Sequence, residues 1–241
     1  MESKLFEKKW ALPELSPAIR GIGINQSGTK IAACFKPEDN EIQIVGNIGN
    51  ILETLSGHRK PVKCVRFHPM DNIIASASED CTVGLWDFEA KRNCRLNYFS
   101  DIVEWVDWSF DGNFLAACGI DGSVVVWDRR GDFISELNGA DGELKMVKWS
   151  PDSAYISAAS NVGLVCVWNI VDRDAVLLKH GSPVISVSWS PSGEKMVTVA
   201  EDGVVRLWEA ATWELAELTG SGNTIFADFS ADGNYLAIGG S

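Results

Sequence analysis

Two columns of aromatic residues return at a nearly constant interval along the 241-residue chain. The first column has spacings of 41, 41 and 40 residues and consists of Trp86, Trp127, Trp168 and Trp208. The second has spacings of 41, 41, 40 and 40 residues and consists of Phe67, Trp108, Trp149, Trp189 and Phe229. Because two independent columns keep one period, the chain repeats a single structural unit of about 40 residues.

Each repeat unit has the local pattern of β-structure. Short runs rich in Val, Ile, Trp and Cys are separated by turn sequences such as S-P-D-S at 150–153 and S-P-S-G at 190–193. A further short strand closes the units, as at residues 51–55, 133–137 and 215–218. Four strands in every 40 residues, without a helical period, predict an all-β fold rather than a helical or α/β repeat.

The marker residues of these units resemble those of the WD-repeat family of β-propellers. They are the Gly57-His58 pair, the turn aspartate Asp80, and the Trp-Asp pairs at 86–87 and 127–128. The resemblance covers residues 18–241 and implies five complete four-stranded blades plus a partial sixth. It is specific for the fold and says little about function.

The chain is divided by blades only, because nothing inside it resembles a linker. The expected blades are residues 18–56, 57–99, 100–138, 139–178 and 179–219, with a partial blade at 220–241. Residues 1–17 form an N-terminal segment that is a candidate for the outer strand of the closing blade. Because natural folds rarely leave a sheet edge bare, we expect the sequence to be a fragment of a six- or seven-bladed ring.

The resemblance assigns a structural role to two sets of polar residues. In the family, blades close to the consensus carry a buried hydrogen-bonded relay of Asp, His, Ser or Thr, and Trp, which satisfies the indole and imidazole. By position, the second blade has His58, Ser76, Asp80 and Trp86, and the fifth has His180, Thr198, Asp202 and Trp208. The third blade has Phe99 and Ala117 in place of the histidine and serine, so apolar packing is expected there.

The sequence offers little support for catalysis. His58, Ser76 and Asp80 are the residue types of an acyl-transfer triad, but the serine is expected mid-strand, without a nucleophile elbow. The third histidine, His68, is expected in a surface turn. No two of the six cysteines are closer than 13 residues, so no C-x-x-C metal or redox motif exists. We therefore predict no catalytic, cofactor-binding or metal-ligating residues, no cofactor and no enzymatic activity.

Charge and hydropathy limit the kinds of partner and the cellular compartments that we expect for this chain. The formal net charge is −12, from 33 acidic and 21 basic residues, which disfavours binding to nucleic acid or anionic lipid. No run of 18 apolar residues and no secretory signal are present, so we expect no membrane association and a cytoplasmic or nuclear protein.

A candidate partner-binding ring follows from the resemblance. A position near the start of each innermost strand is expected at the mouth of the central channel, and those positions hold Arg20, Lys63, Glu104, Lys145, Ile185 and Ile225. One hypothesis is that Arg20, Lys63 and Lys145 anchor an acidic or phosphorylated peptide. The alternative is that they are ordinary solvated residues. The next residues, Trp105 and Met146, are either exposed anchors or packing between blades.

The function predicted is that of a non-catalytic scaffold or adaptor subunit, which binds other proteins within a multiprotein complex. The alternative is a subunit of an RNA-processing or chromatin-associated complex. An enzyme that uses the propeller loops is a third class, which no metal or nucleophile motif supports.

Overall fold

The computed structural model describes residues 19–35, 40–88, 90, 92–220 and 224–240. The N-terminal segment 1–17, which the sequence suggests as a closing strand, lies outside the described residues. In the described part of the chain every regular element is a β-strand. That part accordingly contains no helix of the length and apolarity needed to cross a membrane.

Five sheets have four strands each, and a sixth sheet has two. The first sheet contains β1 (Ile19–Ile24), β2 (Lys30–Phe35), β3 (Ile42–Gly46) and β4 (Ile51–Leu55). The second contains β5 (Val62–Phe67), β6 (Ile73–Ser78), β7 (Thr82–Asp87) and β8 (Arg92–Asn97). The third contains β9 (Val103–Trp108), β10 (Phe114–Gly119), β11 (Val124–Asp128) and β12 (Phe133–Leu137).

The remaining sheets continue the same order. The fourth contains β13 (Leu144–Trp149), β14 (Tyr155–Ser160), β15 (Leu164–Asn169) and β16 (Ala175–Lys179). The fifth contains β17 (Val184–Trp189), β18 (Lys195–Ala200), β19 (Val204–Glu209) and β20 (Glu214–Gly220). The two-stranded sheet contains β21 (Thr224–Phe229) and β22 (Leu236–Gly240). Within each sheet, neighbours in sequence pair antiparallel.

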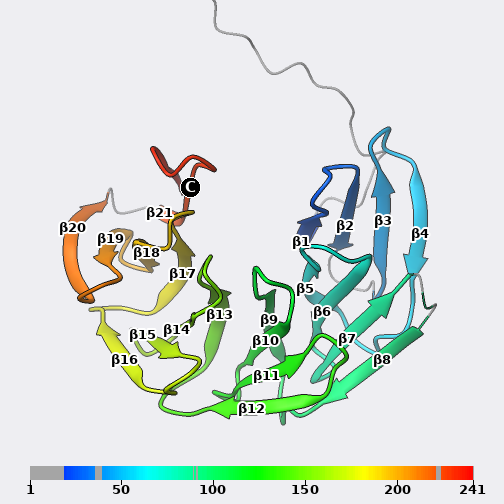
Figure 1. Ribbon diagram of the computed structural model, residues 1–241, viewed down its shortest axis with the longest axis horizontal. Coiled ribbons are helices and arrows are strands. Elements are labelled where there is room, and N and C mark those ends of the chain that lie inside the picture. The colour runs from blue at the N-terminus through cyan, green and yellow to red at the C-terminus, as the bar shows by residue number, and fades with distance from the viewer. Residues whose placement is uncertain (1–18, 36–39, 89, 91, 221–223, 241) are drawn as a thin grey trace, which may run out of the picture.

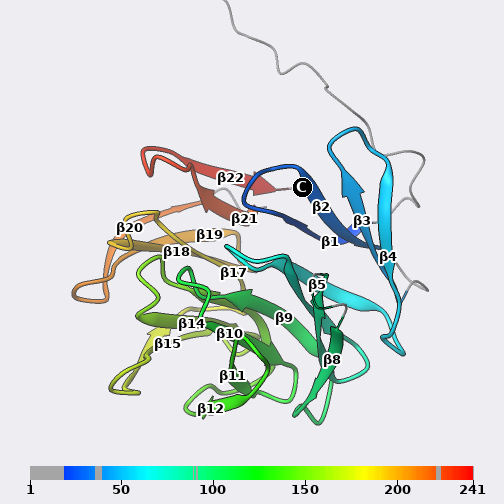
Figure 2. The same cartoon turned by 45° about the vertical axis from the view of Figure 1, so that its right-hand side comes forward.

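The six sheets are arranged as blades around a common axis. Figure 1 shows β1, β5, β9, β13, β17 and β21 on the inside of an open arc, with the fourth strands of the blades on the outside. Figure 2 shows the same arc obliquely, with β4 and β8 forward on the right. This arrangement confirms the predicted all-β propeller, with five four-stranded blades and a two-stranded sixth.

The hydrophobic core lies between the blades rather than within one of them. Both aromatic columns pack against the preceding blade. Trp86, for example, lies in a cluster with residues of the first blade, whereas Trp127 and Trp108 share a cluster with residues of the second. Trp168 and Trp149 likewise join the third and fourth blades. The constant period therefore reflects one inter-blade contact that is repeated at each step.

One histidine departs from the sequence-based expectation. His68 is not in a surface turn but is only 2% exposed. Its Nε2 atom lies 2.8 Å from the carbonyl oxygen of Gly112 in the next blade, and its Nδ1 accepts the backbone N–H groups of Met70 and Asp71. The prediction was wrong because the turn after β5 is covered by the corresponding turn of the third blade, where Gly112 has a φ of 71°.

Candidate partner-binding site

The polar relay assigned to the second blade is brought together as a continuous chain. The indole Nε1–H of Trp86 donates to Ser76 Oγ at 2.9 Å, and His58 Nε2 lies 2.8 Å from the same oxygen. His58 Nδ1 lies 2.9 Å from Asp80 Oδ2. Ser76 is fully buried, so this serine is a hydrogen-bonding link beneath the surface and not an exposed nucleophile.

Burial determines the direction of the pKa shift of His58, whereas hydrogen bonds determine that of Asp80. Burial lowers the pKa of His58, although the adjacent Asp80 acts to raise it. Burial would raise the pKa of Asp80, but hydrogen bonds from Thr82, the Arg59 backbone N–H and His58 outweigh it and bring the pKa to about 2. The relay is thus a neutral imidazole held by a carboxylate that stays ionised.

The relay assigned to the fifth blade is only partly formed. Trp208 Nε1–H donates to Thr198 Oγ1 at 2.9 Å, and His180 Nε2 lies 2.8 Å from that oxygen. Including Asp202 in this relay was wrong, because His180 Nδ1 lies 3.1 Å from the carbonyl oxygen of Leu178 instead. Asp202 faces Arg206, with Oδ2 and Nη2 3.7 Å apart.

The two blades differ in the residue that pairs with the relay's serine or threonine across the sheet. In the second blade Gly84 pairs with Ser76 across the sheet, and a Cβ at Gly84 would lie 2.9 Å from His58 Nε2. In the fifth blade the equivalent partner of Thr198 is Arg206. Arg206 pairs with the Asp202 carboxylate and lies close enough to His180 to lower its pKa, whereas His180 Nδ1 faces a backbone acceptor.

In the less regular blades the tryptophan side chains have other partners than a histidine–serine relay. In the fourth blade Trp168 Nε1–H donates to the carbonyl oxygen of Asn138 at 2.7 Å. In the third blade Phe99 is 7% exposed and packs against Trp127, with ring centroids 6.1 Å apart. These contacts are structural, and none of them provides a surface for a ligand.

The predicted partner-binding ring, here called the first ring, contains several short ion pairs. Its members are Arg20, Lys63, Glu104, Lys145, Ile185 and Ile225. Lys63 Nζ lies 2.8 Å from Glu104 Oε2, and Lys145 Nζ lies 4.0 Å from Glu104 and 2.8 Å from Glu143. Arg20 Nη1 lies 2.6 Å from Glu79 Oε1. The structure therefore brings Lys63, Glu104 and Lys145 together, with a carboxylate already close to each of the three predicted anchors.

The two apolar positions of the first ring differ in their surroundings. Ile185 packs against the cluster between the fifth and sixth blades, whereas Ile225 is 57% exposed. The neighbouring Trp105 and Met146 serve as packing between blades: Met146 is 6% exposed, and Trp105 contacts three successive core clusters.

A second ring lies three residues further along the same inner strands. It consists of Arg66, Asp107, Lys148, Ser188 and Asp228, and these side chains line a pocket of about 290 Å³. Three residues of a strand span about 10 Å, so this ring lies toward the opposite mouth of the channel. The rest of its wall is formed by Phe67, Pro69, Trp108, Ser109, Phe110, Trp149 and Trp189.

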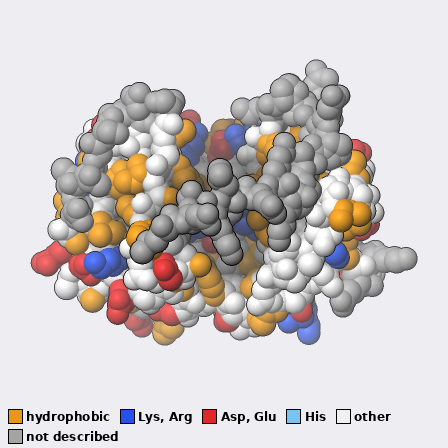
Figure 3. Space-filling view, turned by 90° about the horizontal axis from the view of Figure 1, so that it is seen from above, with side chains coloured by type: hydrophobic (Ala, Val, Ile, Leu, Met, Phe, Trp, Pro, Cys, Tyr) orange, Lys and Arg blue, Asp and Glu red, His pale blue; other side chains and the backbone are white. Residues whose placement is uncertain are grey.

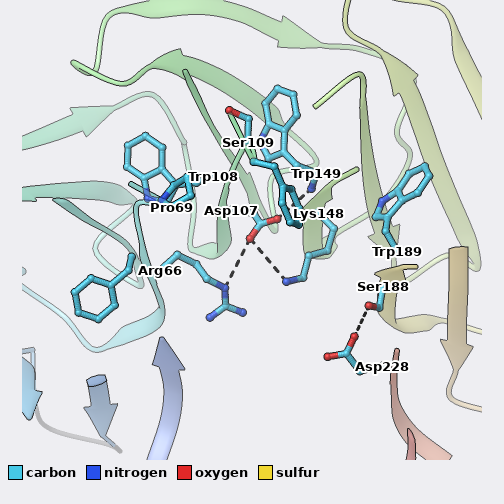
Figure 4. Close-up of a pocket in the computed structure, with 12 residues that line it drawn as sticks. Arg66, Pro69, Asp107, Trp108, Ser109, Lys148, Trp149, Ser188, Trp189 and Asp228 are labelled. Atoms are coloured by element: carbon cyan, nitrogen blue, oxygen red, sulfur yellow. Dashed lines mark hydrogen bonds and ion pairs between the residues drawn. The ribbon is translucent and has the colours of Figure 1, made fainter. Parts of the chain in front are cut away.

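Figure 4 shows Arg66 and Lys148 approaching Asp107 from either side. Arg66 Nε and Lys148 Nζ each lie 3.7 Å from Asp107 Oδ1, and the other carboxylate oxygen accepts the backbone N–H of Trp149 at 3.0 Å. The guanidinium of Arg66 lies 4.7 Å and the Lys148 ammonium 5.8 Å from the ring centroid of Trp105. Ser188 donates to Asp228 at 2.5 Å.

The second ring was not predicted from the sequence, although the sequence contains a signal for it. Its members stand immediately before the second aromatic column, at the same spacings of 41, 41, 40 and 40 residues. A charged or hydroxyl residue at the same position of five successive inner strands indicates a shared surface facing the channel. Among the described residues, no group of three or more metal-ligating side chains is close enough to hold an ion.

Repeated four-stranded blades, inter-blade tryptophans and the His58 relay define the chain as a WD-repeat β-propeller. A family model described as the first β-propeller of IFT122 matches residues 18–241. The chain belongs to this family.

Individual relatives match over shorter stretches. The nuclear distribution protein nudF of Emericella nidulans is 32% identical over 93 residues, which cover 35% of this chain and 20% of that protein. A Lissencephaly-1 homolog of Trichoplax adhaerens is 51% identical over 37 residues, or 15% of this chain and 9% of the relative. The nuclear distribution protein PAC1 of Mycosarcoma maydis is 64% identical over 36 residues, which cover 15% of this chain and 8% of that protein. The chain thus spans only a small part of these relatives.

Proposed function

We propose that this propeller is a non-catalytic scaffold or adaptor domain, which binds other proteins through the mouths of its central channel. The supporting observation is that inner strands of consecutive blades carry equivalent polar side chains around one channel. A partner at either mouth would contact several blades at once, which gives a rigid composite surface. The family assignment supports a protein-binding role of this kind.

The surface chemistry is consistent with specific rather than general adhesion. Figure 3 looks onto the side where the two end blades face each other and shows hydrophobic side chains in small groups interspersed with charged ones. A mixed surface of this kind selects partners by charge and shape. The net charge of −12 disfavours nucleic acid as the main ligand.

An acidic segment in the partner is the finer part of the proposal. The first ring carries Arg20, Lys63 and Lys145, but an incoming carboxylate or phosphate must displace Glu79, Glu104 or Glu143 from them. Binding of an acidic peptide there is tested with Lys63→Glu and Lys145→Glu, and unchanged affinity would exclude the first ring as its site.

We also place the domain in the cytoplasm or nucleus. The six cysteines include four that are buried in the core, and all six are free thiols. Free thiols of this number are usual in reducing compartments. Fractionation of cells that express a tagged chain tests this placement.

The central experiment is affinity purification of the full-length protein from its own cells, with quantitative mass spectrometry of what it retains. The proposal expects a reproducible set of proteins that survives nuclease treatment. If the wild-type protein retains no protein above background, the proposed function is wrong. Retention of RNA instead, with a steep salt dependence, would favour the alternative of an RNA-processing subunit.

A further inference from the structure

The two mouths of the channel differ in how closely their lysine and arginine side chains pair with carboxylates. In the first ring the closest nitrogen–oxygen distances of Arg20, Lys63 and Lys145 are 2.6, 2.8 and 2.8 Å. In the second ring the nitrogens of Arg66 and Lys148 are both 3.7 Å from Asp107. The first distances are within hydrogen-bonding range, and the Arg20–Glu79 and Lys145–Glu143 pairs are hydrogen-bonded, whereas the second distances are too long for a direct hydrogen bond. The second ring therefore keeps donors for an incoming acceptor.

The donors of the second ring can be followed atom by atom. Arg66 uses Nη1 to donate to the carbonyl oxygens of Ile22 and Val65, at 2.9 and 2.8 Å. Its Nη2 and the Lys148 ammonium have no hydrogen-bond acceptor in the part of the chain that the structure describes. Both side chains are only about a quarter exposed, at 22% and 27%. Partly buried cations attract an anion more strongly than solvated ones do.

These donors are already positioned for binding. Arg66 is fixed by its two backbone acceptors and by its contact with the Trp105 ring, and Lys148 lies near the same indole. Because the side chains are held before a ligand arrives, little rotamer entropy is lost on binding. Figure 4 shows both nitrogen groups directed into the space between β5 and β13.

Charge selects the kind of group that fits. Arg66, Asp107 and Lys148 together carry one excess positive charge, and a single carboxylate would balance it. A cation would find Asp107 already flanked by two positive groups and bonded to the Trp149 backbone. Asp228, the other charged side chain of the pocket, accepts a hydrogen bond from Ser188 on the neighbouring inner strand and keeps its negative charge, so the four charged side chains of the pocket sum to zero. The excess positive charge is local to Arg66 and Lys148, and one carboxylate is complementary to the site beside that pair.

Size and wall composition indicate where that carboxylate comes from. A pocket of about 290 Å³ is at the lower limit for a small-molecule site and suits one or two side chains. Its wall includes the exposed ring of Phe110, which is 57% accessible, and Pro69. A protein segment can present an acidic and an apolar side chain together.

We propose that the second ring binds an aspartate or glutamate side chain of a protein partner between Arg66 and Lys148. An apolar neighbour of that residue packs against Phe110 and Pro69. This inference rests on the proposed protein-binding function and adds the mouth that is used and the residue that is recognised.

The test uses a library of random dodecapeptides displayed on phage and selected against the full-length protein. The proposal expects selected peptides to share an Asp or Glu next to an apolar residue. The best peptide and its version with Gln for Glu, or Asn for Asp, are then measured against wild type and Lys148→Met. We expect Lys148→Met to weaken the acidic peptide about three- to tenfold and to leave the amide version nearly unchanged.

Three controls make the outcome specific. Lys148→Arg keeps the charge and should retain most of the affinity, whereas Lys145→Met alters the other mouth and should have no effect. Thermal unfolding of each variant shows whether it folds. Selection without acidic enrichment, equal loss for both peptides, or sensitivity to Lys145→Met in place of Lys148→Met would overturn the second-ring site. The affinity purification then decides separately whether the protein-binding function stands.

Discussion

Asp80 Oδ2 lies 2.9 Å from His58 Nδ1, and the two side chains are only 4% and 0% exposed. The equivalent residues of the fifth blade, Asp202 and His180, make no such contact, because His180 faces a backbone carbonyl. Two blades that look alike in sequence therefore differ in how their histidine is held. This difference can be measured.

Asp80→Asn should destabilise the protein much more than Asp202→Asn. The Asp80 carboxylate accepts hydrogen bonds from Thr82, the Arg59 backbone and His58, and an amide cannot replace all of them. We expect a loss of about 2 kcal/mol in the free energy of unfolding for Asp80→Asn. For Asp202→Asn, which loses only a loose pair with Arg206, we expect about 0.5 kcal/mol or less. Urea unfolding measures both, and equal losses would contradict the assignment.

Gly112→Ala should destabilise the contact between the second and third blades. Gly112 has a φ of 71°, and a Cβ there would lie 2.6 Å from His68 Cε1. Gly193→Ala is the matched control, because Gly193 has a φ of 74° in the same turn of the fifth blade but its nearest neighbour would be 3.8 Å away. We expect the free energy of unfolding to fall by about 1 kcal/mol for Gly193→Ala and by about 2–4 kcal/mol for Gly112→Ala, measured by urea unfolding. Similar values would mean that His68 does not close this contact.

Stability should fall as the pH decreases from 6.5 toward 4. Burial and the nearby Arg206 lower the pKa of His180 to about 4, so the unfolded chain binds a proton in this range before the folded one does. Unfolding is therefore favoured at low pH, by about 1 kcal/mol at pH 5 after allowance for partial exposure of the ring. His58 acts in the same direction. His180→Gln should flatten the dependence of unfolding free energy on pH over this range, and an unchanged slope would exclude His180 as a source.

Cysteine reactivity should separate the core from the surface. Burial raises the pKa of Cys34 to about 12 and the pKa of Cys118 well above its usual value, so neither thiol is expected to ionise in the native protein. Cys94 is exposed on β8. Mass spectrometry after brief alkylation should find Cys94 labelled first, whereas the buried thiols require denaturant. Early labelling of Cys118 would contradict the inter-blade core.

The sequence predicted the fold well because the propeller is determined by a local repeat. Trp127 and Trp168 fall in equivalent inter-blade clusters, and β4 and β12 have the bounds expected for the closing strands of their units. Repeated short-range patterns need no knowledge of distant contacts. His68 was misplaced because its burial depends on a turn of the next blade, 44 residues away.

The candidate site was less predictable, because it depends on which partners the long charged side chains contact. Repeat columns place Lys63 and Lys145 at the channel, but they do not show that Glu104 lies between them. The loose pairing of Arg66 and Lys148 with Asp107 likewise follows from side-chain geometry and stacking on Trp105. Repeat position thus identifies which residues share a mouth, whereas contact geometry decides which of them are available to a partner.

Site-specific photo-crosslinking tests most directly whether a partner contacts a channel mouth. A photoreactive phenylalanine analogue is placed at Phe110, on the rim of the second-ring pocket, and in a parallel variant at Leu177, which is exposed on the outer strand β16. Both variants are irradiated in cells before purification, and the linked peptides are identified by mass spectrometry. We expect crosslinks from position 110 to a partner segment that contains Asp or Glu, and few or none from position 177. Crosslinks from position 177 without any from 110 would contradict it.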